Sequence, residues 1–123
     1  FERATVYPAE PISGFVFAMS PEEKEEAARR QNAQAAEIQK TAEAIRPALT
    51  VLDELNVALS CGMVTRENAE KLIDVALAFG DVVSTGRNAP DWLRARADYV
   101  SEIDAKKHPF ETEKLAAREG IEY

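Results

Sequence analysis

The sequence contains little of what most catalytic and metal sites are built from. Among its 123 residues there is one cysteine and one histidine. The lone Cys61 excludes a disulfide within the chain and fits a reducing compartment, so we expect a cytoplasmic protein. The lone His108 excludes di-iron sites that need two Glu-x-x-His motifs. We therefore predict no catalytic residue, no metal site and no cofactor.

Glycine and long apolar runs are also scarce. Only five glycines are present, and long β-branched runs are missing, which favours helices over strands. No apolar run approaches the roughly 20 residues of a membrane-spanning helix, so we expect no membrane association. The segment Ser84–Asn88 has too few glycines for a phosphate-binding loop.

The sequence has fewer basic than acidic residues. The chain has 15 basic and 22 acidic residues, and its formal net charge is −7. Even the most basic stretch, residues 87–107, has carboxylates between its cations. Because nucleic-acid binding depends on cationic side chains that displace counterions, we predict no direct nucleic-acid binding. A protein partner, or a second copy of the chain, is the favoured ligand.

The first 19 residues differ from the rest. Residues 1–19 contain Pro8, Pro11 and Gly14, which exclude a long helix, so we predict an extended arm there. Four aromatic side chains are concentrated in this arm: Phe1, Tyr7, Phe15 and Phe17. The arm either folds onto its own domain or docks on a partner through this aromatic cluster. Residues 20–123 are predicted to form a single helical-bundle domain.

The strongest pattern lies between residues 20 and 62. Ser20, Pro21 and Glu23 form a capping box with proline at the first helical position. Spacings of three and four then place one apolar stripe along a helix predicted over residues 21–61: Ala28, Ala35, Ile38, Ala42, Ile45, Leu49, Leu52 and Leu59. Pro47 either ends this helix or bends it, and we favour a continuous bent helix because Pro47 lies opposite the stripe.

Two more long helices are predicted after Gly62. Thr65 caps a helix over residues 66–84 whose apolar positions cover more than one face, as in the centre of a bundle or beneath a second chain. A third helix is predicted from residues 88–90 to the stop at Pro109, and a short one over residues 111–119. The predicted fold class is all-α, an antiparallel helical bundle of three main helices with a short C-terminal helix and an extended N-terminal arm.

Few polar residues are candidates for a catalytic or binding site. The carboxylate pairs Glu67 with Glu70 and Asp53 with Glu54 are interpreted as solvated helix faces. Glu67 is predicted to form an ion pair with Lys71, four residues later. Asn56 either selects the register of the helical seam or lies at its edge.

Partner contacts are predicted at Phe15 and Phe17 of the arm and at an aromatic and arginine patch of the third helix: Trp92, Arg94, Arg96 and Tyr99. Such residue types are enriched at interface hot spots, although a core tryptophan flanked by surface arginines explains the same pattern. The favoured function is a non-enzymatic interaction or assembly module that self-associates or binds a partner protein. The alternative is an acidic inhibitor that occupies a basic nucleic-acid-binding site on an enzyme.

Overall fold

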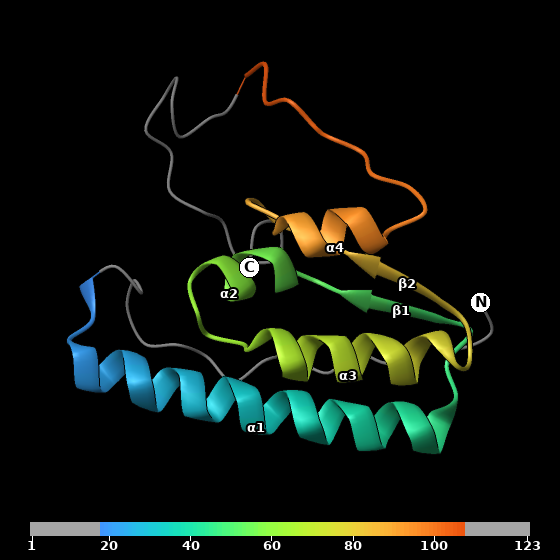
Figure 1. Cartoon of the computed structure of the whole chain (residues 1–123), viewed down its shortest axis with the longest axis horizontal. Coiled ribbons are helices and arrows are strands. Elements are labelled where there is room, and N and C mark those ends of the chain that lie inside the picture. Colours follow the sequence, from blue (N-terminus) through green and yellow to red (C-terminus); the bar gives the residue numbers. More distant parts are fainter. Residues whose placement is uncertain (1–17, 108–123) are drawn as a thin grey trace.

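The computed structural model describes residues 18–107, and over this range the chain is a mixed α/β protein (Figure 1). The predicted all-α bundle is wrong, because two segments that were assigned to helices pair as parallel strands. In chain order the elements are α1 (Pro21–Ile45), β1 (Leu49–Leu52), α2 (Leu55–Ser60), α3 (Arg66–Leu77), β2 (Asp81–Ser84) and α4 (Asp91–Arg96).

Helix α1 begins where the sequence predicts and ends earlier. The Glu23 N–H donates to Ser20 Oγ at 3.2 Å, and the Ser20 N–H donates to Glu23 Oε2 at 2.7 Å, which confirms the capping box. The helix ends at Ile45, and Arg46 adopts a left-handed conformation with φ 48°. A residue before proline is disfavoured in the α conformation, so Pro47 stops the helix. The prediction of one bent helix through Pro47 is wrong.

Strands β1 and β2 pair in parallel, with Thr50 opposite Val82 and Leu52 opposite Ser84. Helices α2 and α3 make the crossover that parallel strands require. Gly80 permits this pairing, since a Cβ there would lie 2.1 Å from the carbonyl oxygen of Ala48. That close approach lets the Asp81 N–H donate to the same oxygen at 3.0 Å. The predicted helix over residues 66–84 therefore stops at Leu77.

Helix α3 forms the centre of the fold, between α1 and the strands (Figure 1). Its buried face belongs to one apolar cluster with β1, α2 and the turn before α3: Leu52, Leu55, Val64, Ala69, Leu72 and Ile73. Helix α1 lies along α3 through small side chains, and Ala35 and Ala42 are each 4% exposed. Ile45 is 52% exposed, so the predicted stripe is buried only along part of its length.

The other face of the sheet is open over the described residues. Val51 and Val83 lie opposite each other in register and are both exposed. Parallel sheets are usually covered on both faces, so this apolar face is unusual.

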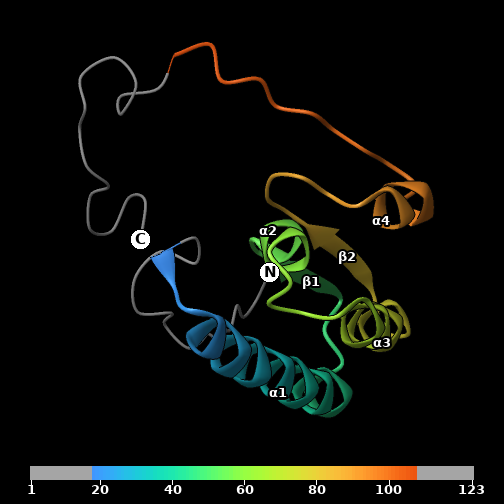
Figure 2. The same ribbon diagram turned by 60° about the vertical axis from the view of Figure 1, so that its left-hand side comes forward.

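The C-terminal part of the described chain is mostly extended. Helix α4 ends at Arg96, and residues 97–107 run away from the other elements as an extended strap (Figure 2). The predicted long third helix is therefore wrong. The predicted helix over residues 111–119 and nearly all of the predicted arm lie outside the described residues. Within residues 18–107, no helix has the length and apolarity needed to cross a membrane.

Candidate functional site at the carboxyl ends of the strands

The carboxyl ends of β1 and β2 bring three polar residues and a glycine together. Asp53 and Glu54 follow β1, and Thr85 and Gly86 follow β2. In open parallel sheets, ligands bind in the space beyond the carboxyl ends of the strands. Both carboxylate residues are exposed there. We call residues 53–54 and 85–86 the strand-end site.

The Thr85 side chain connects the two halves of the strand-end site. Its hydroxyl donates to Asp53 Oδ1 at 2.6 Å and accepts the Glu54 N–H at 3.0 Å. The Thr85 N–H donates to the Leu52 carbonyl at 3.2 Å, which continues the strand pairing by one step. One side chain on the β2 side thus holds both acidic residues on the β1 side.

Glu54 occupies a conformation that few residues other than glycine adopt. Its φ of 57° places it in the left-handed region, directly before α2. Gly86, with φ 112°, lies beside it, and a Cβ at Gly86 would approach Glu54 Oε2 to 3.2 Å. Among residues 18–107, no donor forms a hydrogen bond with the Glu54 carboxylate. Within the described range, the Glu54 carboxylate is therefore not engaged by the chain's own donors.

Asn56 fixes the loop that carries Thr85. It is 7% exposed, its Nδ2 donates to the Gly86 carbonyl at 3.0 Å, and its Oδ1 accepts from Ser84 Oγ at 2.6 Å. Its backbone N–H donates to the Thr85 carbonyl at 3.1 Å. Neither sequence interpretation of Asn56 applies, because the residue lies in α2 and not in a seam of α1.

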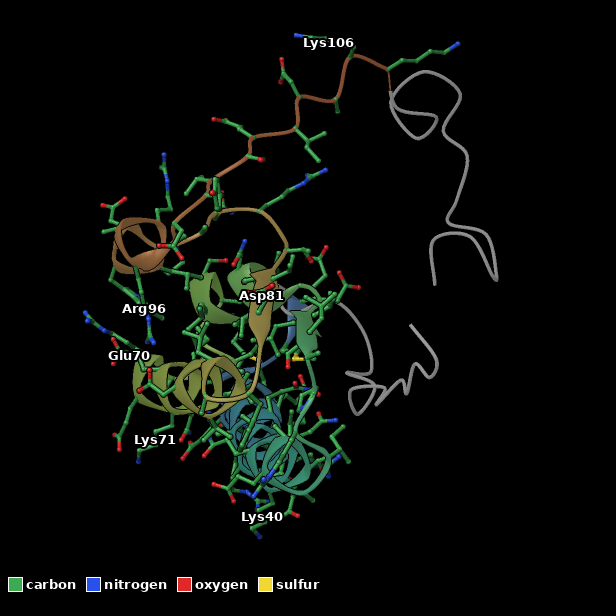
Figure 3. The ribbon with its side chains drawn as sticks, turned by 90° about the vertical axis from the view of Figure 1, so that its right-hand side faces the viewer. Lys40, Glu70, Lys71, Asp81, Arg96 and Lys106 are labelled. Atoms are coloured by element: carbon green, nitrogen blue, oxygen red, sulfur yellow. The ribbon has the colours of Figure 1, made fainter. Side chains whose placement is uncertain are left out.

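The predicted partner-binding residues are only partly brought together. Trp92 is half-buried against the apolar cluster, and the Arg66 guanidinium lies 5.0 Å from its ring centroid. Arg96 points towards α3 (Figure 3) and pairs there with Asp74. Arg94 and Tyr99 are exposed, and Phe15 and Phe17 lie outside the described residues. No observation tests partner binding by these six residues, so it stays a prediction.

A shallow hollow near the start of α1 is a weaker candidate. It is lined by Glu22, Glu25, Glu26 and Arg29. Hydrogen bonds from Arg29 and Arg30 lower the pKa of Glu26, so its carboxylate is engaged within the helix. Three carboxylates make this hollow unfavourable for an anion. In the part of the chain that the structure describes, no group of three His, Cys, Asp or Glu side chains could hold a metal ion.

The comparisons with known proteins identify the family. The family model described as "ATP:corrinoid adenosyltransferase BtuR/CobO/CobP" matches residues 3–123, nearly the whole chain. The chain belongs to the ATP:corrinoid adenosyltransferase family. A corrinoid adenosyltransferase of Pseudomonas aeruginosa is 37% identical over 75 residues, 61% of this chain and 36% of that protein. One from a Sinorhizobium species is 35% identical over 79 residues, 63% of this chain and 36% of that protein.

The matched stretch spans about a third of the length of these two adenosyltransferases. No solved structure gives a significant match to the chain. The predicted non-enzymatic interaction module and its alternative, the acidic inhibitor, are both wrong, because the adenosyltransferase family consists of enzymes. The prediction of a protein partner as the main ligand is wrong for the same reason, since the family description names ATP and a corrinoid.

The two acidic residues of the strand-end site are visible in the sequence, but their spacing does not reveal their role. Asp53 and Glu54 were interpreted as part of a solvated helix face. The available signal was the short, mainly apolar run Leu49–Leu52 directly before them, which includes two β-branched residues and follows Pro47. A short run of this kind between turn signals fits a buried strand. The ion pair predicted between Glu67 and Lys71 is confirmed at 2.7 Å.

Proposed function

We propose that this chain takes part in adenosyl transfer from ATP to a corrinoid, and that the strand-end site binds the phosphate end of ATP through a divalent cation. The observation that supports this most directly is the pair of exposed carboxylates, Asp53 and Glu54, at the carboxyl end of a parallel strand. Family membership supports the reaction class, and the position at the carboxyl ends of parallel strands supports the site.

The residues present fit a cation of the magnesium type. Mg²⁺ is usually held by one or two carboxylates, with waters and substrate phosphates as its other ligands. Asp53 and Glu54 supply those carboxylates, and one oxygen of Asp53 is already fixed by Thr85. When bound, such a cation neutralises negative charge on the phosphates of ATP. A complete cage of protein ligands is not required, in agreement with the small number of acidic groups at this edge.

Among the residues that the structure describes, Arg87 is the one best suited to the phosphates themselves. It follows Gly86 in the loop after β2 and is exposed. Within residues 18–107, no carboxylate forms an ion pair with it. A guanidinium presents several donors in a plane and binds phosphate oxygens in pairs. The negative net charge of the chain therefore does not prevent phosphate binding at this one edge.

The chemistry also accounts for the polar character of the site. Transfer of the adenosyl group of ATP leaves triphosphate as the second product, because the adenosyl group is ATP without its three phosphates. A site that holds the phosphates in place orients the bond that breaks. Asp53, Glu54 and Arg87 would perform this orienting role. A reaction of this kind between soluble substrates fits a cytoplasmic location, which we also propose.

The experiment is an assay of the chain with ATP, Mg²⁺ and a reduced corrinoid, with both adenosylated corrinoid and triphosphate measured. We expect Asp53→Asn to lower kcat/KM by at least tenfold, with a steeper dependence on Mg²⁺ concentration. The matched control is Asp81→Asn, which neutralises an exposed carboxylate at the opposite end of the same sheet. Equal losses for both variants would contradict the placement of the site, and absence of both products would contradict the proposed reaction.

A further inference from the structure

We propose that Thr85 is a positioning residue of the strand-end site: its hydroxyl orients the Asp53 carboxylate towards the divalent cation. This inference rests on the proposed function, because it assumes that a cation binds there. Thr85 does not touch the substrate in this role. It acts through Asp53.

The geometry carries the proposal. The Thr85 hydroxyl has one proton to donate, and that proton goes to Asp53 Oδ1 at 2.6 Å. The Thr85 hydroxyl oxygen in turn accepts the Glu54 N–H at 3.0 Å. With Oδ1 held, Asp53 keeps Oδ2 for a ligand. With its N–H held, Glu54 keeps its left-handed backbone conformation, from which its carboxylate lies beside Gly86.

The hydroxyl is itself held in place. Thr85 forms backbone hydrogen bonds in both directions, from its N–H to Leu52 and from the Asn56 N–H to its carbonyl. The Asn56 side chain also forms hydrogen bonds with Ser84 and Gly86, the two residues that flank Thr85. The loop that carries the hydroxyl is therefore anchored independently of the bond to Asp53. Groups that orient a metal ligand in this way typically change metal affinity by about 10–100-fold when they are removed.

This arrangement offers a matched control within two adjacent residues. Ser84 and Thr85 each donate a side-chain hydrogen bond of 2.6 Å across the same pair of strand ends. The Ser84 bond goes to Asn56 and the Thr85 bond goes to Asp53. A purely structural role predicts similar behaviour for the two variants that lose these bonds. A positioning role predicts that only loss of the Thr85 bond weakens cation binding.

The test uses the ¹⁵N-labelled full chain and Mn²⁺, which prefers the same oxygen ligands as Mg²⁺ and broadens nearby amide signals. For the unmodified chain we expect broadening centred on residues 53–54 and 85–86. Thr85→Val, which keeps the shape and removes the hydroxyl, is expected to need about tenfold more Mn²⁺ for the same broadening. Thr85→Ser is expected to stay within about twofold of the unmodified chain, and Ser84→Ala to lose thermal stability without a change in Mn²⁺ binding.

The outcomes separate this inference from the proposed function. Broadening of the unmodified chain away from the strand ends would overturn the cation site on which the inference rests. Broadening at the strand ends that is unchanged in Thr85→Val, or is weakened equally in Ser84→Ala, would overturn the positioning role alone. Should Thr85→Val lose its dispersed spectrum, Thr85→Ala replaces it, because the smaller side chain removes the hydroxyl without adding a methyl group next to Asp53.

Discussion

Replacing Asn32 by alanine should remove the main polar connection between α1 and the rest of the fold. The Asn32 side chain makes four hydrogen bonds: its Nδ2 donates to the carbonyls of Ala28 and Met63, and its Oδ1 accepts from the Thr65 N–H and from Asn68 Nδ2. Three of these four partners belong to the turn before α3 or to α3 itself, at distances of 2.8–3.2 Å. One half-buried side chain therefore fixes the entry to α3 against α1.

The expected cost follows from the partners that are left without a bond. Each buried group that loses its partner costs roughly 1–3 kcal/mol, and groups that water can reach cost less. Because Thr65 is exposed and Asn68 is half-buried, water recovers part of the loss. We therefore expect Asn32→Ala to lower the free energy of unfolding by about 2 kcal/mol. For a chain of 123 residues, that corresponds to a fall in Tm of roughly 8 °C.

Urea unfolding followed by circular dichroism measures this loss, with the midpoint and the slope fitted separately. The control is Glu43→Ala, an exposed position on the same helix, which should change stability by less than about 0.5 kcal/mol. A change for Asn32→Ala as small as that of the control would refute the view that Asn32 holds α1 to α3.

Three further predictions concern contacts of the sheet, of the apolar cluster and of α4. Gly80→Ala should destabilise the chain by about 1–3 kcal/mol or prevent β1–β2 pairing, because its Cβ would collide with the Ala48 carbonyl; unchanged unfolding would contradict the strand assignment. Leu72→Ala should cost about 2–5 kcal/mol in urea unfolding, since Leu72 is 3% exposed in the apolar cluster, and a loss below 1 kcal/mol would place it outside the core. Arg96→Ala should cost at most about 1 kcal/mol in thermal unfolding, because its pair with Asp74 is partly exposed, and a loss above 2 kcal/mol would be inconsistent with that exposure.

Local signals at helix starts were reliable in this sequence. Ser20, Pro21 and Glu23 predicted the first residue of α1, and Thr65 predicted the start of α3, whose cap accepts the Asn68 N–H at 3.2 Å. These signals depend on a side chain and a backbone N–H within three residues of each other, so the sequence alone contains the whole interaction. Prediction succeeded at these two helix starts because the deciding contact was local.

The strands were missed because their deciding contacts are distant in sequence. Leu49 and Leu52 are spaced by three, which also fits a helix, and the pairing partner that makes β1 a strand lies in residues 81–84. Gly80 was the one local sign against a helix over residues 66–84, since glycine inside a helix costs about 1 kcal/mol relative to alanine. Short apolar runs do not separate buried strands from buried helices by spacing alone.

The strand-end site was missed for the same reason, because its contacts join residues that are distant in sequence. Asp53 and Thr85 are bonded to each other yet lie 32 positions apart in the chain. Once β1 was assigned to a helix, its terminal carboxylates could only be interpreted as a helix surface. The net charge was equally misleading, because it describes the average over the chain and not the groups at one edge of a sheet.

Titration of the ¹⁵N-labelled chain with Mg²⁺ and ATP, followed through its backbone amide signals, tests the location of the site most directly. We expect the largest shifts at Asp53, Glu54 and residues 85–87, with little change at Asp81 on the opposite end of the sheet. Shifts that instead gather around Trp92 and Arg94, or no shifts at millimolar ATP, would contradict a nucleotide site at the carboxyl ends of β1 and β2.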